Sequence, residues 1–121
     1  MIVVTGAAGF IGSNLVRGLN IARYKDIVLV DDFSRADRVR NYEKKQYSTK
    51  VDRKELAQWI HHNHRFIQII IHMGARTDTT EFSWAVFKEL NVDYSKEVFN
   101  ICIEYGLPII YASSAATYGL G

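Results

Sequence analysis

Short, continuously apolar stretches recur along the chain and alternate with stretches in which apolar residues return every three or four positions. The apolar runs predict strands buried on both faces at residues 2–5, 27–30, 66–72 and 108–112. The intervening periodicity predicts crossover helices. Because buried strands that alternate with helices are typical of a parallel sheet, the pattern predicts an α/β protein with a doubly wound sheet.

Two helices are clearly indicated. One begins near Gly9, and we expect its inner face to carry Ile11, Leu15, Val16 and Leu19. The other covers residues 82–105 and is closed by Gly106 and Pro108. The apolar residues expected along one side of this longer helix are Phe87, Leu90, Tyr94, Val98, Ile101 and Cys102.

The pattern weakens between the second and third of these apolar runs. Residues 34–53 are polar and rich in Lys and Arg, with a few anchoring positions and room for one more short strand. Those anchors are Val39, Tyr42, Tyr47 and Val51. Residues 54–64 then predict a helix through Leu56, Trp59 and Ile60.

Composition supports one ordinary globular domain, since the 121 residues are 48% hydrophobic and 23% charged. A net charge of +2 gives no basic face, which argues against nucleic acid as a partner. The apolar runs are far shorter than the roughly 20 residues of a membrane span, so no membrane association is expected. No basic segment precedes the first strand, which argues against a signal peptide.

Cys102 is the single cysteine, so neither an internal disulfide nor a cysteine-based metal cluster is expected, and a reducing, cytoplasmic setting fits best. A solvated helix end explains the crowding of His61, His62 and His64 better than a metal site, because no carboxylate or cysteine completes a ligand set. We therefore expect no metal. Aromatic residues at helical spacing, expected in the core or in the interface of a homo-oligomer, are Trp59, Trp84, Phe87 and Phe99.

A glycine motif follows the first strand and opens the first helix. Gly6 would permit a tight turn, Gly9 would let backbone approach a pyrophosphate, and Gly12 would let the helix pack closely. The helix N-terminus would offer N–H groups to phosphate. This order of strand, turn and helix favours a Rossmann-type dinucleotide site over a purely structural turn, and its GxxGxxG spacing is similar to that of short-chain dehydrogenases.

Two acids end the second strand, where a carboxylate would meet the adenosine ribose: Asp31 and Asp32. An acid there favours NAD, because it repels a 2′-phosphate. Arg35, Arg38 and Arg40 follow, however, and a guanidinium can clamp a phosphate. These residues therefore leave both NAD and NADP open as the cofactor. The alternatives to a role in cofactor binding are a solvated turn for the two acids and a solvated loop for the three arginines.

Small and polar residues also follow the two later strands, at residues 72–77 and 112–119. In an open parallel sheet, ligands lie beyond the carboxyl ends of the strands. Convergence of glycine, acid, glycine-alanine and serine at four strand ends therefore predicts one shared crevice. Capping of the next helix is the simpler explanation for the serine turn taken alone.

Taken together, five segments resemble the ADP-L-glycero-D-manno-heptose 6-epimerases, a family within the extended short-chain dehydrogenases. They are the glycine turn, residues 30–32, residues 73–81, Asn91 with residues 94–96, and residues 111–119. The resemblance implies an enzyme of lipopolysaccharide inner-core synthesis that acts on a nucleotide-sugar. Such an enzyme oxidises C6 of the heptose with tightly held NADP and returns the hydride to the other face.

The resemblance also assigns roles by position. Phe10 and Ile11 would flank the pyrophosphate, Asp31 and Asp32 would meet the ribose, and Arg38 would meet the 2′-phosphate. Arg53 would match a second basic position through a looser alignment. Residues expected to line the cofactor are Met73, Gly74, Ala75, Arg76 and Thr77. Met73 departs from the acid that some relatives carry.

Asn91 would fix the helix beneath the cofactor, and Ser114 would hydrogen-bond the reacting hydroxyl. The family also needs a tyrosine base with a lysine four residues later, a pair not found here. We therefore expect residues 1–121 to be the N-terminal part of an NAD(P)-binding domain, without its substrate domain and without turnover. The alternatives are another nucleotide-sugar epimerase or dehydratase, and a non-catalytic nucleotide-binding module.

Overall fold

Five parallel strands form one sheet in the order β3-β2-β1-β4-β5. The computed structural model describes residues 1–34, 36–73 and 94–112. The strands are β1 (Ile2–Thr5), β2 (Ile27–Asp31), β3 (Thr49–Asp52), β4 (Ile69–Met73) and β5 (Ile109–Ala112). The predicted parallel α/β sheet is confirmed, and β3 is the additional strand expected among residues 34–53.

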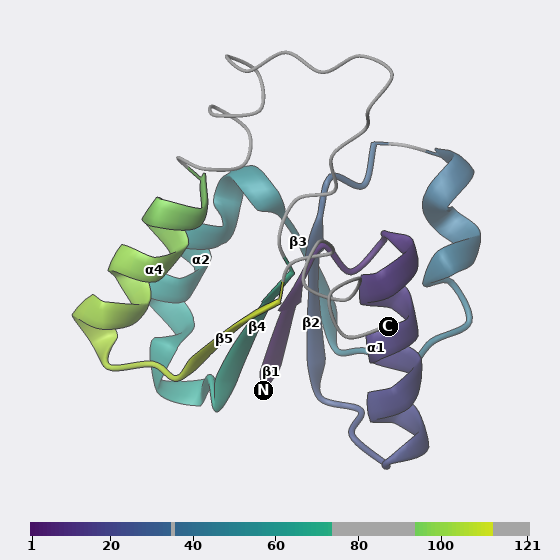
Figure 1. Cartoon of the computed structure of the whole chain (residues 1–121), viewed down its shortest axis with the longest axis horizontal. Coiled ribbons are helices and arrows are strands. Elements are labelled where there is room, and N and C mark those ends of the chain that lie inside the picture. The colour runs from purple at the N-terminus through teal and green to yellow at the C-terminus, as the bar shows by residue number, and fades with distance from the viewer. Residues whose placement is uncertain (35, 74–93, 113–121) are drawn as a thin grey trace.

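Helices cover both faces of the sheet (Figure 1). The α-helices are α1 (Phe10–Ile21), α2 (Leu56–Asn63) and α4 (Tyr94–Tyr105). The 3-10 helices are η1 (Ala36–Asn41), η2 (Arg53–Glu55) and η3 (His64–Phe66). In Figure 1, α2 and α4 lie on one side of the sheet, and α1 and η1 lie on the other. This two-sided cover is the doubly wound arrangement that the sequence predicts.

Two apolar cores result, because alternate residues of a strand face opposite sides. Val3 of β1 packs in one core with Leu56 and Ile60 of α2 and Val98 of α4. Ile2 and Val4 of the same strand face the second core. The other buried members of this second core are Ala7, Ala8, Val16, Ile27, Leu29 and Tyr42. The sheet is thereby held rigidly between the two helical layers.

Two apolar residues do not lie where periodicity placed them. Ile11, expected on the inner face of α1, is 37% exposed, because it lies in the first turn, at the end of the helix. Phe66, expected in a strand, belongs to η3 and is 65% exposed. The reason is register: Ile69 pairs with Ile2, the first residue of β1, so no residue of β1 lies opposite Phe66.

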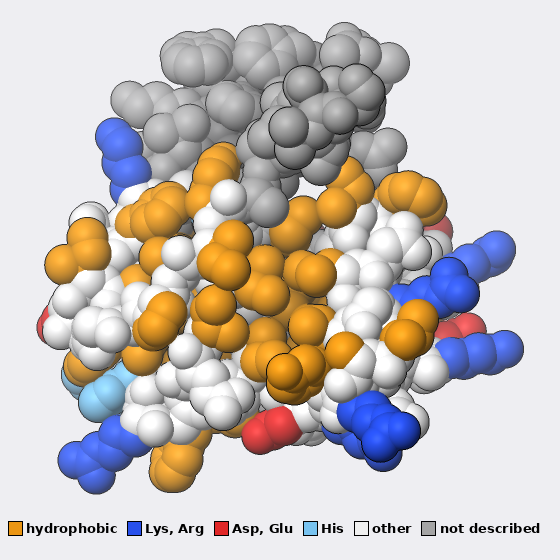
Figure 2. All heavy atoms as spheres, turned by 60° about the horizontal axis from the view of Figure 1, so that its bottom comes forward, with side chains coloured by type: hydrophobic (Ala, Val, Ile, Leu, Met, Phe, Trp, Pro, Cys, Tyr) orange, Lys and Arg blue, Asp and Glu red, His pale blue; other side chains and the backbone are white. Residues whose placement is uncertain are grey.

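β5 also differs from expectation, since burial on both faces was predicted. It is an edge strand that pairs with β4 alone among the described strands, and Ile110 and Tyr111 are 53% and 49% exposed. Figure 2 shows hydrophobic side chains gathered across the middle of the face it displays, between the two helical layers. Of the predicted helix at residues 82–105, α4 confirms the second half, and residues 82–93 lie outside the described residues.

The order of the strands defines where a ligand would lie. From β1 the chain proceeds to β2 and β3 on one side, and then continues with β4 and β5 on the other. Such a reversal opens a crevice beyond the carboxyl ends of the two central strands. Thr5 ends β1 and Met73 ends β4, so Met73 and the turn that follows Thr5 border this crevice. Within the described ranges, no helix has the length and apolar character needed to cross a membrane.

Candidate functional site

The glycine turn between β1 and α1 depends on the absence of side chains at two positions. Gly6 has φ +67°, and a Cβ there would lie 3.1 Å from Met73 Cβ at the end of β4. A Cβ on Gly12 would lie 2.0 Å from the carbonyl oxygen of Gly6. The first turn of α1 therefore packs directly on the backbone of the turn, as the glycine motif predicts.

The start of α1 is open to an external anion. Gly9 is its N-cap in an extended conformation, and no side chain caps the helix or places an acid in its first turn. The first bond into the helix is donated by Ser13 N to Gly9 O at 2.9 Å. The earlier N–H groups of α1 thus have no partner within the helix. Phe10, 71% exposed, and Ile11 border this opening.

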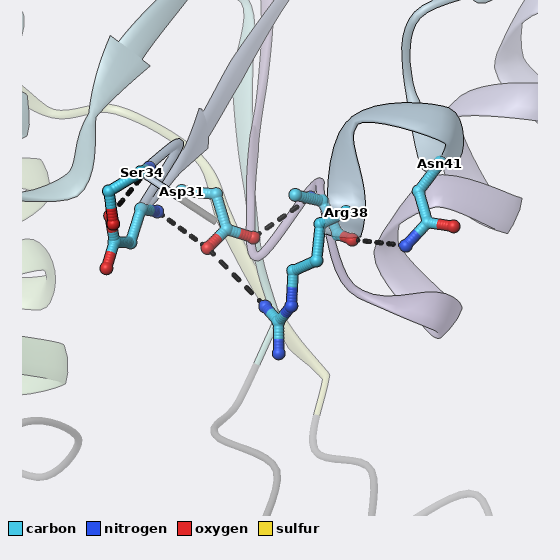
Figure 3. Close-up of polar contacts among 6 residues, drawn as sticks. Asp31, Ser34, Arg38 and Asn41 are labelled. Carbon is cyan, nitrogen blue, oxygen red and sulfur yellow. Dashed lines mark hydrogen bonds and ion pairs between the residues drawn. The ribbon is translucent and has the colours of Figure 1, made fainter. Parts of the chain in front are cut away.

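Asp31 joins the end of β2 to the glycine turn (Figure 3). Its Oδ2 accepts a hydrogen bond of 2.9 Å from Ala8 N, and its Oδ1 accepts one of 2.7 Å from Asp32 N. Arg38 Nη1 lies 4.0 Å from the same Oδ1. The carboxylate is thus held against the turn and partly neutralised by a guanidinium from η1.

Asp32 is oriented differently from Asp31. Its exposed side chain accepts a hydrogen bond of 3.0 Å from Ser34 N. Hydrogen bonds from the Ser34 side chain and backbone lower the pKa of Asp32, which keeps it ionised at neutral pH. Of the two acids expected at the ribose, Asp31 is the one held at the glycine turn.

Arg53 lies on another side of the crevice, in η2 directly after β3. Its guanidinium carbon is 4.3 Å from the centroid of the Tyr94 ring, at the start of α4. Seven expected or considered positions lie outside the described residues: Arg35, Gly74, Ala75, Arg76, Thr77, Asn91 and Ser114. The described part of the site therefore consists of the glycine turn and the ends of β1, β2, β3 and β4.

His72 is a structural element of this crevice that the sequence pattern does not single out. His72 is 2% exposed, and its Nδ1 lies 2.7 Å from Thr5 Oγ1 while its Nε2 lies 2.8 Å from Ser95 Oγ. Burial, and secondarily the charge of Arg53, lower the pKa of His72 to about 4. The one feature of the sequence that could have indicated this role is a polar residue directly after the three isoleucines of β4.

Asn41 was also missed. Its Nδ2 donates a hydrogen bond of 2.8 Å to Ala8 O, which ties the end of η1 to the glycine turn (Figure 3). Ala8 is thus held from both directions, through its N–H by Asp31 and through its carbonyl by Asn41. No local pattern marks such a contact, because the two residues are 33 positions apart.

Comparison with known proteins agrees with this geometry. The chain is 42% identical, over its whole length, to an ADP-L-glycero-D-manno-heptose-6-epimerase from Fusobacterium nucleatum, of which it covers 37%. The crystal structure of the enzyme of that name from Helicobacter pylori matches with a TM-score of 0.69 and 27% identity, over 98% of this chain and 40% of the other. A UDP-galactose 4-epimerase structure matches with a TM-score of 0.71 and 28% identity, over 98% and 39%.

The chain therefore spans about two fifths of the length of these relatives. The model of one family, described as the NAD dependent epimerase/dehydratase family, matches residues 2–121. With the parallel sheet, the glycine turn and the carboxylate at the end of β2, this match shows that the chain belongs to the NAD dependent epimerase/dehydratase family.

Proposed function

We propose that the whole protein is an ADP-L-glycero-D-manno-heptose 6-epimerase that inverts C6 of ADP-D-glycero-D-manno-heptose, in the synthesis of the lipopolysaccharide inner core. The single observation that carries this proposal is 42% identity, over all of this chain, to a relative of that name. The fold does not favour this sugar over others, since a UDP-galactose 4-epimerase matches equally well.

We assign the diphosphate of the cofactor to the glycine turn. Gly6, with φ +67°, permits the tight turn beside Met73, Gly9 places no side chain over it, and Gly12 lets the start of α1 pack on it, so that the free N–H groups of α1 could reach an anion. Phe10 and Ile11 border the same opening and would flank the diphosphate. Two observations support this assignment of the diphosphate: α1 is a helix of 12 residues without a side-chain cap, and the turn has no room for a Cβ at Gly12.

We assign the adenosine ribose to Asp31, with Asp32 beside it, and the 2′-phosphate of NADP to Arg38. A lone carboxylate at Asp31 would repel a 2′-phosphate, but the guanidinium 4.0 Å away offsets that charge and can bind phosphate. Arg53 is a second basic group on the crevice. NADP is therefore the proposed cofactor, with NAD as the alternative.

The remaining roles follow family positions. Residues proposed to line the cofactor are Met73, Gly74, Ala75, Arg76, Thr77 and Asn91. Ser114 would donate or accept a hydrogen bond at the reacting hydroxyl of the nucleotide-sugar. The bound dinucleotide would supply a hydride acceptor that later returns the hydride, so that no net oxidation results.

The proposed enzyme is a cytoplasmic homo-oligomer. The reducing cytoplasm would keep the Cys102 thiol intact, consistent with the absence of a second cysteine in this chain. The exposed apolar strand β5 supports burial of this surface in the whole protein, since large exposed apolar patches are uncommon on isolated domains.

Turnover assays on the intact protein test the proposal. ADP-D-glycero-D-manno-heptose should be converted to its C6 epimer, and UDP-sugars should not react. Turnover of a UDP-sugar instead would support another epimerase or dehydratase, whereas dinucleotide binding without any turnover would support a non-catalytic module. Titration calorimetry should give tighter binding of NADP than of NAD, and Arg38→Ala should remove that preference.

A further inference from the structure

Asn41 and Arg38 both reach from η1 to the same short stretch of backbone. Asn41 Nδ2 donates to Ala8 O at 2.8 Å, and Arg38 Nη1 lies 4.0 Å from the Asp31 carboxylate that accepts from Ala8 N. Figure 3 shows these side chains converging on the turn from η1 and β2. The two residues are three positions apart, and residues i and i+3 of a 3-10 helix lie on the same side.

η1 is a short surface segment, and contacts at Val39, Asn41 and Tyr42 hold it against the rest of the protein. It is six residues long, and none of its residues is buried. Short 3-10 helices are weakly stable by themselves, so tertiary contacts must set their position. Val39 packs partly against the apolar core, and Tyr42, the residue after Asn41, is 5% exposed, which anchors the C-terminal end of the segment. The Asn41 amide adds a directional contact with the glycine turn.

We propose that Asn41 is a positioning residue that fixes the rotation of η1 against the glycine turn, and thereby sets the preference for a dinucleotide with a 2′-phosphate over one without. Loss of the Asn41–Ala8 hydrogen bond frees η1 to rotate, and the Arg38 guanidinium then no longer stays beside Asp31. The inference rests on the proposed assignment of the dinucleotide to this crevice.

The hydrogen bond from Asn41 also acts on the turn itself. Ala8 lies between Gly6 and Gly9, so holding its carbonyl orients the peptide groups that precede the start of α1. This second effect should weaken NAD and NADP binding alike. The effect through Arg38 should weaken NADP alone, so the ratio of the two dissociation constants separates the contributions.

Titration calorimetry on the intact protein, freed of copurified dinucleotide, tests the proposal with NADP and NAD as probes. Asn41→Ala should weaken NADP binding roughly tenfold and NAD binding roughly twofold, as expected for one hydrogen bond that positions a charged group. Asn20→Ala is the matched control, because its amide also donates to two backbone carbonyls, those of Tyr24 and Gln46, at the other end of α1. That control should leave the NADP to NAD ratio unchanged.

A double-mutant cycle separates positioning from general stability. In an Arg38→Ala background, Asn41→Ala should no longer change the NADP to NAD ratio, because the group that it positions is gone. An unchanged NADP to NAD ratio in Asn41→Ala, with or without an equal loss of affinity for both dinucleotides, would overturn the inference. If Asn41→Ala fails to fold, Asn41→Ser, whose shorter hydroxyl cannot take the place of the amide, should give the same shift in ratio.

The experiment distinguishes failure of this inference from failure of the proposed function. A wild-type protein that binds neither dinucleotide overturns the proposed function and this inference together. A wild-type protein that binds NAD more tightly contradicts the proposed cofactor, yet Asn41→Ala must still shift the ratio further toward NAD. Binding of NADP without any shift overturns the role of Asn41 alone.

Discussion

Thr5 and His72 are 67 residues apart in the sequence, and a hydrogen bond of 2.7 Å joins Thr5 Oγ1 to His72 Nδ1 across neighbouring strands. Thr5 Oγ1 also accepts from Met73 N at 3.0 Å, and its hydroxyl hydrogen can be donated to His72 Nδ1. With Thr5 as the donor, the proton of the neutral imidazole lies on Nε2 and is donated to Ser95 Oγ of α4. One buried side chain thus links β1, β4 and α4.

This arrangement makes stability depend on pH. The pKa of His72 is about 4 when folded, against about 6.5 for an unperturbed histidine, so the unfolded state binds more protons between these values. The contribution of His72 is fully present above pH 6.5 and is lost as the pH falls through 4. Between pH 7.5 and pH 5, we expect the free energy of unfolding to fall by about 2 kcal/mol through this residue. Urea denaturation of the intact protein at both pH values measures it.

Two variants separate the charge of His72 from its contacts. His72→Gln should lower the free energy of unfolding at pH 7.5 but remove most of the His72-dependent loss at pH 5, because no group titrates there. Ser95→Ala keeps the buried imidazole, so it should cost about 1 kcal/mol while the pH dependence persists. If His72→Gln retains the full loss at pH 5, the titrating group lies elsewhere.

The close packing of α1 on the glycine turn predicts the cost of a single methyl group. Gly12→Ala would place a Cβ 2.0 Å from Gly6 O, a backbone atom that cannot move without disrupting the turn. We expect a loss of about 3 kcal/mol in the free energy of unfolding. Gly18 of the same helix is the matched control, because a Cβ there meets nothing within 4 Å. Gly18→Ala should stabilise by about 0.5–1 kcal/mol. Similar effects of the two changes in denaturation midpoint would contradict this account.

The part of the site that was predictable is local in sequence. Gly6 and Gly12 belong to a short motif whose steric demands are the same wherever strand, turn and helix follow one another. Asp31 could be found because it ends a run of four buried residues in β2. Each of these signals is contained within a few residues and needs no knowledge of distant contacts.

The contacts that were not predictable join distant segments. Asn41 and Ala8 are 33 positions apart, and His72 contacts a strand that precedes it by 67. Composition and periodicity cannot show which side chain pairs across a sheet. The same limit explains Phe66, since the start of β4 is set by where β1 begins and not by the apolar residues before it.

Removing the charge of Asp31 should affect the binding of NAD and of NADP unequally. Asp31→Asn keeps an oxygen that can accept from Ala8 N but removes the negative charge. NAD should bind roughly tenfold more weakly, because a charged acceptor for the ribose hydroxyls is lost. NADP binding should change little, since the same substitution removes repulsion of the 2′-phosphate. Calorimetry with both dinucleotides measures this, and a parallel tenfold loss of NADP would contradict the assignment of Arg38.

Cys102 should be protected from alkylation by the packing of α4. Its side chain is 1% exposed, and burial raises the pKa of the thiol to about 11. Because the thiolate is the reactive species, ionisation alone should slow alkylation at pH 8 on the order of 100-fold relative to the unfolded chain. Iodoacetamide labelling, followed by mass spectrometry of the peptide that contains Cys102, compares the native protein with the same protein in urea. Equal labelling rates in the two conditions would mean that α4 opens readily from the sheet, and that the contact of Ser95 with His72 is transient.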